Sequence, residues 1–153
     1  MTRGDARELA VHLIYSREFT GEEPRHEVET RLQKEYYAAL ASDHAVYAER
    51  PSKSQIGYID TGVEGVANRG EELNGIIQQY SIGWDISRIS RLTRAIMQLA
   101  VFEALYMEDV PVGVAISEAV RLAKKYDGDD TGAFVNGILG AFARAQTQDK
   151  ETK

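Results

Sequence analysis

The chain has 153 residues, 43% of them hydrophobic and 27% charged, a balance typical of a globular domain with its own core. It has no cysteine, which excludes disulfides, thiolate zinc sites and a cysteine nucleophile, and no run of about 18 apolar residues that would predict a membrane span. The formal net charge of −6 excludes a broadly basic nucleic-acid binder, so any such binding must use a local basic patch.

Helical periodicity runs through the first half of the chain. Apolar residues at three- and four-residue spacing predict helices over 6–19, 28–40, 56–66 and 73–77. Gly21 and Pro24 are expected to end the first helix, and Ser54 to cap the third. The polar stretch 48–54 is predicted to be a loop. Whether the segment 73–77 continues the third helix or restarts as a fourth stays open.

The second half begins at Trp84, and residues typical of helix ends separate its helices. Asp85 is expected to cap a turn before a helix that ends near residue 107, and the dipeptide 110–111 breaks that helix. A helix over 113–126 is predicted to stop at Gly128. Asp130 or Thr131 is then expected to cap the last helix. No alternating segment is long enough for a sheet, which predicts an all-α fold of about seven helices.

No motif for catalysis or metal binding is present. The three histidines, His12, His26 and His44, lack a second ligand at metal-binding spacing. The segment 127–130 superficially resembles a calcium loop, but its glycine is misplaced and the closing glutamate is missing, which favours an inter-helix turn. Nucleotide-binding glycine loops and a nucleophile elbow are also absent. We therefore predict no metal, no cofactor and no catalytic residue.

Arginines recur at helical spacing in two places. They lie near the N-terminus and before the fifth helix: Arg3, Arg7, Arg17, Arg88, Arg91 and Arg94. Each group is either a basic ridge for nucleic acid or an ordinary solvated face, and the charges alone favour the second. Exposed aromatic rings nearby would favour the first, because bases stack on such rings. Tyr15 and Phe134 are the candidates, although each also fits the core.

Four blocks of sequence carry a resemblance to a known family. They are Ala-Arg-Glu-Leu-Ala at 6–10 with Ile-Tyr at 14–15, Arg-Ala-Ile at 94–96, Asp-Val-Pro at 109–111 with Val-Ala-Ile-Ser-Glu-Ala-Val at 114–120, and Phe-Val-Asn-Gly-Ile-Leu at 134–139. In this order and spacing they resemble the NusB family of transcription antitermination factors. The resemblance covers roughly residues 3–144 and is loose between 21 and 55.

The resemblance implies a fold and a function. The fold is a single NusB-like domain, 1–153, of two packed three-helix-type sub-bundles over about 3–80 and 81–146, with a polar, frayed tail at 147–153. The function is transcription antitermination or termination by a scaffold that is not an enzyme. It binds boxA RNA of ribosomal RNA transcripts together with NusE, a small-subunit ribosomal protein, and acts on RNA polymerase indirectly. It works in the cytoplasm without a membrane or a cofactor, and a homodimer is a further assembly that the resemblance allows.

The resemblance also implies site residues. The RNA-binding set is Arg3, Arg7, Tyr15, Asp130 and Phe134. The partner-binding set is Tyr15, Thr93 and Arg94. Thr93 stands where the family carries an acid, and Gly4 and Asp5 stand where basic residues are frequent. These departures keep an alternative open: a divergent NusB-fold protein-interaction module with little RNA binding.

Overall fold

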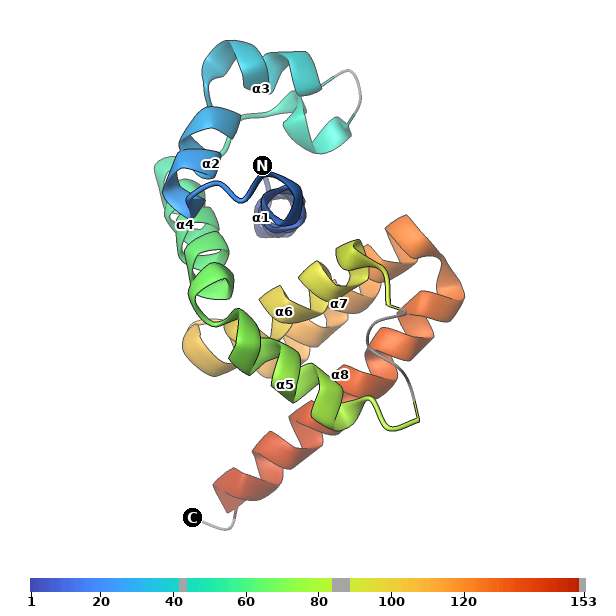
Figure 1. Cartoon of the computed structure of the whole chain (residues 1–153). Helices are drawn as coiled ribbons and strands as arrows, with labels where there is room; N and C mark the ends of the chain where they lie inside the picture. The colour runs from blue at the N-terminus through green and yellow to red at the C-terminus, as the bar shows by residue number, and fades with distance from the viewer. Residues whose placement is uncertain (42–43, 84–88, 152–153) are drawn as a thin grey trace. The chain divides into compact units, whose positions relative to one another are not determined.

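The computed structural model of the chain describes residues 1–41, 44–83 and 89–151 (Figure 1). These residues form helices and no strand, which confirms the all-α prediction. The helices are α1 (Arg3–Thr20), α2 (Pro24–Arg31), α3 (Lys34–Leu40), the short 3-10 helix η1 (Ala45–Ala48), α4 (Lys53–Asn68), α5 (Gly70–Tyr80), α6 (Arg91–Tyr106), α7 (Val112–Asp127) and α8 (Asp129–Glu151). None of them has both the length and the apolar character needed to cross a bilayer.

Contacts along the chain define two compact units, Met1–Asn68 and Arg69–Lys153. The boundary lies earlier than the predicted one near residue 80, because α5 packs against α6 and α8 and so belongs to the second unit. The segment 73–77 therefore restarts as a separate helix instead of continuing α4.

The first unit is built around α1, which packs against α2, α4 and η1. The predicted apolar face of α1 is buried, with Leu9 and Leu13 fully enclosed, and the facing helix α4 buries Ile59 and Val63. Gly21 ends α1 as predicted. It has a φ of 67°, in the left-handed region that favours glycine, and its amide donates to the Arg17 carbonyl at 2.9 Å.

The predicted single helix over 28–40 is wrong, because two helices cover this range. After α2 the backbone becomes extended at Gln33, with a ψ of 131°, before α3 begins. The break changes which tyrosine enters the core: Tyr37 is 1% exposed, whereas Tyr36, which fits the single-helix pattern, is 46% exposed. A guanidinium nitrogen of Arg50 donates to the Leu32 carbonyl at 2.6 Å, which satisfies an acceptor at the break.

The predicted cap and loop before α4 also need correction. Ser52, and not Ser54, caps α4, since the Gln55 amide donates to the Ser52 hydroxyl at 3.2 Å. The Gln55 side chain accepts from the Ser52 amide at 2.8 Å, which completes a capping box. The predicted loop 48–54 is shorter than expected, because η1 includes residue 48 and α4 begins at residue 53.

The second unit consists of α5, α6, α7 and α8. α6 packs against the other three helices and is buried along most of its length. Ser90 caps α6, because its hydroxyl accepts from the Thr93 amide at 3.0 Å. The predictions that Trp84 opens this half and that Asp85 caps a turn, like the arginine at 88, lie outside the described residues.

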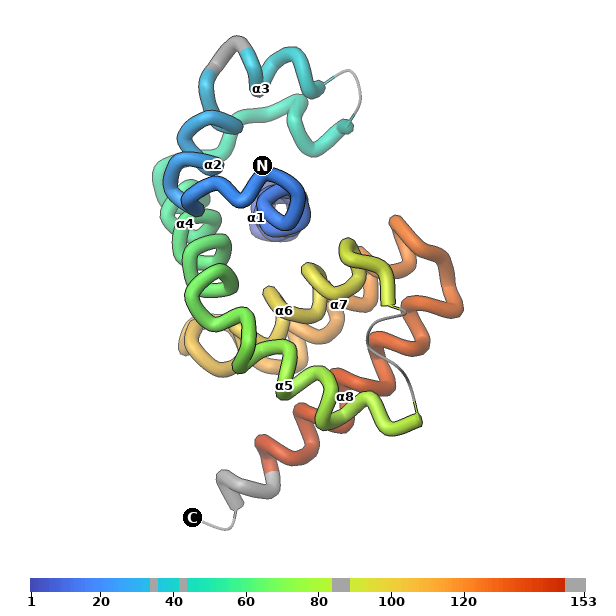
Figure 2. The backbone as a smooth tube through the Cα atoms, viewed as in Figure 1, coloured from blue at the N-terminus to red at the C-terminus, as the bar shows by residue number. Residues whose placement is uncertain are grey.

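Gly128 is the one residue between α7 and α8. Figure 2 shows the backbone passing from one helix into the other. Its φ of 92° ends α7 there, which confirms the predicted stop. The predicted caps of the last helix are wrong: α8 begins at Asp129, and the Gly132 amide donates to the Gly128 carbonyl at 3.1 Å, so Asp130 and Thr131 lie inside the first turn. The tail segment 147–151, predicted to fray, continues α8.

Candidate nucleic-acid interface

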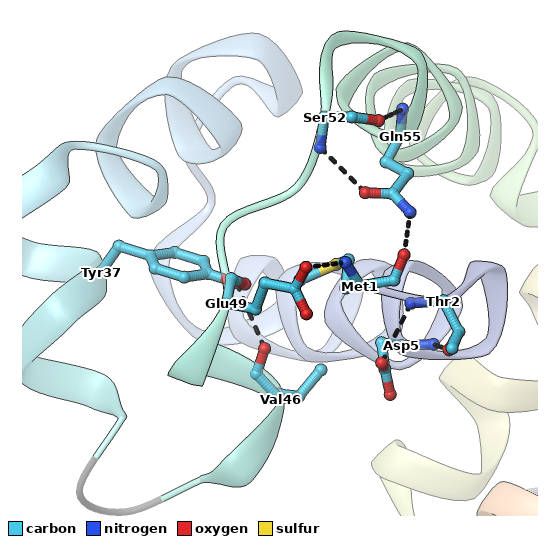
Figure 3. Close-up of polar contacts among 8 residues, drawn as sticks. All are labelled: Met1, Thr2, Asp5, Tyr37, Val46, Glu49, Ser52 and Gln55. Atoms are coloured by element: carbon cyan, nitrogen blue, oxygen red, sulfur yellow. Dashed lines mark hydrogen bonds and ion pairs between the residues drawn. The ribbon is translucent and has the colours of Figure 1, made fainter.

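Hydrogen bonds fix the first turn of α1, which begins at Arg3. Figure 3 shows them between Thr2 and Asp5. The Asp5 amide donates to the Thr2 hydroxyl at 3.0 Å, and the Thr2 amide donates to the Asp5 carboxylate at 3.1 Å. This capping box satisfies two amides that the helix leaves free. Asp5, expected only as a departure from a basic segment, therefore has a structural role.

Met1, which precedes this turn, forms contacts with two other segments. The α-amino group of Met1 forms an ion pair with Glu49 at 2.6 Å, and the Gln55 side-chain amide donates to the Met1 carbonyl (Figure 3). Glu49 follows η1, and Gln55 lies in the first turn of α4. The start of α1 is thus held to two segments of the first unit, and Arg3 projects from an ordered backbone.

The Tyr37 hydroxyl holds the segment that carries Glu49. It donates toward the Glu49 carbonyl at 2.6 Å and lies 3.2 Å from the Val46 carbonyl (Figure 3). Burial raises the pKa of the Tyr37 phenol to about 12, and the neighbouring Tyr47 adds to the rise. The neutral, donating form of Tyr37 is therefore the form that supports this segment at neutral pH.

Two of the predicted RNA-binding residues meet over one aromatic ring. The Arg3 guanidinium lies 4.0 Å from the centroid of the Tyr58 ring, and that of Arg7 lies 5.7 Å from it. These are cation–π distances, and Tyr58 is only 5% exposed. The two arginines differ in access, because Arg3 is exposed and Arg7 is 4% exposed. Arg3 thus offers the accessible charge, while Arg7 lies within the fold.

An exposed aromatic pair occupies the other end of α1. Tyr15 is 37% exposed, and its ring meets the Phe19 ring edge to face at a centroid distance of 5.0 Å. Phe19, at 59% exposure, was not among the predicted site residues. The signal that could have found it is an aromatic residue one helical turn after Tyr15.

The remaining predicted residues belong to the second unit. Asp130 and Phe134 lie one turn apart near the start of α8, the first exposed and the second half-buried. Thr93 and Arg94 lie in the first turn of α6. Thr93 is 1% exposed and Arg94 is half-buried. The predicted RNA-binding set therefore divides between the units, with Arg3, Arg7 and Tyr15 in the first.

A cluster of two hydroxyls and a carboxylate surrounds Thr93. The Thr93 hydroxyl donates to the Asp127 carboxylate oxygen Oδ2, and the Ser90 hydroxyl lies 3.0 Å from the same oxygen. Asp127 is exposed, at the end of α7. Asp127 was not among the predicted site residues, because nothing local in the sequence connects it to Thr93.

A shallow groove of about 870 Å³ runs along α7 and α8. Lys124 and Arg121 line it beside Ser117, Asn136 and the acidic Asp129. This mixed lining has no donor set typical of one cofactor. In the described parts of the chain, no three histidine, aspartate or glutamate side chains are grouped so that they could hold a metal ion.

Together these features define a class: small all-α proteins built from two compact helical units. The NusB family model matches residues 4–144 of the chain. The chain therefore belongs to the NusB family. The resemblance seen in the sequence is thereby confirmed.

Three similar proteins illustrate the relationship. The transcription antitermination protein NusB of Acetivibrio thermocellus is 37% identical over 146 residues, which cover 95% of this chain and 91% of the relative. A crystal structure of T. maritima NusB superposes with a TM-score of 0.76 at 26% identity, covering 94% of this chain and 92% of that one. A chain from a crystal structure of the antitermination factors NusB and NusE with double-stranded RNA has a TM-score of 0.72 at 24% identity, with coverages of 94% and 96%. This last likeness supports the fold alone.

Proposed function

We propose that this chain is a transcription antitermination factor that binds boxA RNA of ribosomal RNA transcripts together with NusE. The observation that carries the proposal is membership of the NusB family over residues 4–144, with a relative 37% identical over almost the whole chain that bears the name transcription antitermination protein. The protein acts in the cytoplasm as a scaffold that contacts RNA polymerase indirectly. It makes and breaks no bond, and a homodimer is an alternative assembly of the free protein.

The geometry of α1 supports RNA binding at its N-terminal end. Arg3 carries an exposed positive charge beside the first turn, where the helix dipole also favours an anion. Tyr15 offers an exposed ring on which a base can stack. In the second unit, Asp130 and Phe134 complete the proposed RNA-binding set. Arg7 is 4% exposed, so in this proposal it adds positive electrostatic potential to the site and makes no direct contact with RNA.

The proposed partner-binding residues are Tyr15 in the first unit and Thr93 and Arg94 in the second, and the proposed partner is NusE. The net charge of −6 supports dependence on this partner, because few cations are available to displace counterions from RNA. The isolated chain is expected to bind boxA weakly and NusE to strengthen that binding. A plot of the logarithm of RNA affinity against the logarithm of salt concentration should have a slope of about −0.7 for each phosphate contact. We expect roughly two to four such contacts.

The test is binding of labelled single-stranded boxA RNA, with and without NusE, over a salt series. Arg3→Ala should weaken binding most at about 50 mM salt and reduce the salt slope by about 0.7, because it removes one phosphate contact. The matched control is Arg25→Ala, an exposed arginine of α2 outside the proposed surface, which should leave both quantities unchanged. Failure of the wild type to bind boxA at low salt, even with NusE, would contradict the proposed function.

A second function, the divergent interaction module, is favoured by the limited exposure of Arg7, since this leaves fewer accessible cations on α1. Under this alternative the chain binds another protein, or itself, and boxA is bound neither by the chain alone nor by its mixture with NusE. Retention of both ligands in one complex eliminates it.

A further inference from the structure

The proposed partner-binding set contains a residue that is almost inaccessible to a partner. Thr93 is 1% exposed, and its hydroxyl proton is directed to Oδ2 of Asp127. Asp127 itself is exposed. The group offered to solvent at the start of α6 is therefore a carboxylate carried by α7, and not the threonine hydroxyl.

Hydroxyl groups and the local backbone orient this carboxylate. Ser90 lies 3.0 Å both from Oδ2 of Asp127 and from the Thr93 hydroxyl, so its single proton serves one of these two acceptors. The Thr131 hydroxyl donates to the Asp127 backbone carbonyl at 3.2 Å. Gly128, with its φ of 92°, ends α7 immediately after Asp127. The side chain is thus held at one oxygen and its backbone is fixed on both sides.

The other oxygen remains available. Among the residues that the structure describes, Oδ1 of Asp127 has no hydrogen-bond partner, whereas Oδ2 has the two hydroxyls. A carboxylate oxygen accepts best from a charged donor, and such hydrogen bonds are roughly twice as strong as neutral ones. The two hydroxyls already restrict the Asp127 side chain. Binding of a charged donor therefore costs less conformational entropy than it would at a freely rotating carboxylate.

We propose that Asp127 is a partner-binding residue, whose carboxylate receives a lysine or arginine side chain of NusE, and that Ser90 and Thr93 are its positioning residues. The inference rests on the proposed function, from which it takes the start of α6 as the partner surface. Thr93 then acts through Asp127, and the acidic group of this surface comes from α7.

A purely structural role makes a different prediction. A carboxylate near the first turn of α6 also stabilises that helix through its dipole, typically by a few tenths of a kcal/mol to about 1 kcal/mol. Loss of that role lowers thermal stability but leaves partner affinity unchanged. Affinity and stability must therefore be measured on the same variants.

The decisive variant is Asp127→Asn, which keeps an oxygen acceptor for the hydroxyls and removes the charge. The matched control is Asp129→Asn, which removes an exposed carboxylate two residues away, in the first turn of α8. Binding of purified NusE to the full chain is measured at about 50 and 200 mM salt, a range over which exposed charge pairs weaken. Thermal unfolding of each variant is measured in parallel.

We expect Asp127→Asn to weaken NusE binding about fivefold or more at the lower salt, to slow association, and to reduce the salt dependence of the association rate. Asp129→Asn should match the wild type in all three. Equal binding by Asp127→Asn and the wild type overturns the inference and leaves the proposed function intact, as does an equal loss in both variants. Absence of NusE binding by the wild type overturns the proposed partner, and this inference with it.

Discussion

Replacement of Tyr37 by phenylalanine tests how the segment behind the N-terminus is held. The change removes the phenol that donates toward the Glu49 carbonyl at 2.6 Å and lies 3.2 Å from that of Val46. A buried hydrogen bond contributes about 0.5–1.5 kcal/mol net. The longer contact adds less than the shorter one, so the free energy of unfolding should fall by about 1–2 kcal/mol at pH 7.

The pH dependence makes this prediction sharper. Since burial raises the pKa of Tyr37 to about 12 from 10, its contribution is fully present below pH 10 and is lost as the pH rises toward 12. At pH 11 ionisation of this group should lower the free energy of unfolding of the wild type by about 1.4 kcal/mol, because one pKa unit corresponds to about 1.36 kcal/mol. The phenylalanine variant has no such loss, so the difference between the two proteins should shrink by about that amount.

Urea unfolding followed by circular dichroism at pH 7, 10 and 11 measures both effects. The matched control is Tyr36→Phe, the neighbouring tyrosine at 46% exposure, whose removal should change stability little at pH 7. Tyr47, whose pKa burial also raises, keeps its own share of the alkaline loss in both proteins. An unchanged stability of Tyr37→Phe at pH 7, or a difference that grows with pH, would refute the reasoning.

Two further changes test the helix ends. Thr2→Ala removes the hydroxyl of the α1 capping box and should lower the free energy of unfolding by about 1 kcal/mol, while Thr2→Ser should retain it; urea unfolding distinguishes them. Gly128→Ala places a side chain at a φ of 92° and a ψ of 173°, a conformation open essentially to glycine alone, and should cost about 1–3 kcal/mol. Thermal unfolding of Gly113→Ala is its control: Gly113 is helical with open space around it, so this change should not destabilise the protein.

Local signals predicted most helices of the second unit. The apolar period of α7 and the breakers on either side, Pro111 and Gly128, act within a few residues of the ends they set. The break between α2 and α3 was missed because the spacing of apolar residues from Val28 to Leu40 fits one helix equally well. Burial of Tyr37 in place of Tyr36 decides between the two, and that burial depends on tertiary packing.

The sequence predicted which kinds of residue make up the candidate site, but not which of their side chains are exposed to solvent. Arg3 and Arg7 have the same charge and lie one turn apart, yet only Arg3 is exposed. Thr93 was found through the resemblance, whereas the carboxylate that it meets lies 34 residues away on another helix. Such pairings arise from packing of distant segments, which periodicity and motif spacing do not encode.

The two capping boxes of the first unit are joined to each other. Gln55, which completes the box at the start of α4, also donates to the carbonyl of Met1, directly before the box at the start of α1. In the proposed RNA contact only the side chain of Arg3 therefore has to be ordered on binding, because folding has already restricted its backbone. Loss of this exposed cation should slow formation of the proposed RNA complex, and the ordered backbone should lengthen the lifetime of that complex in the wild type.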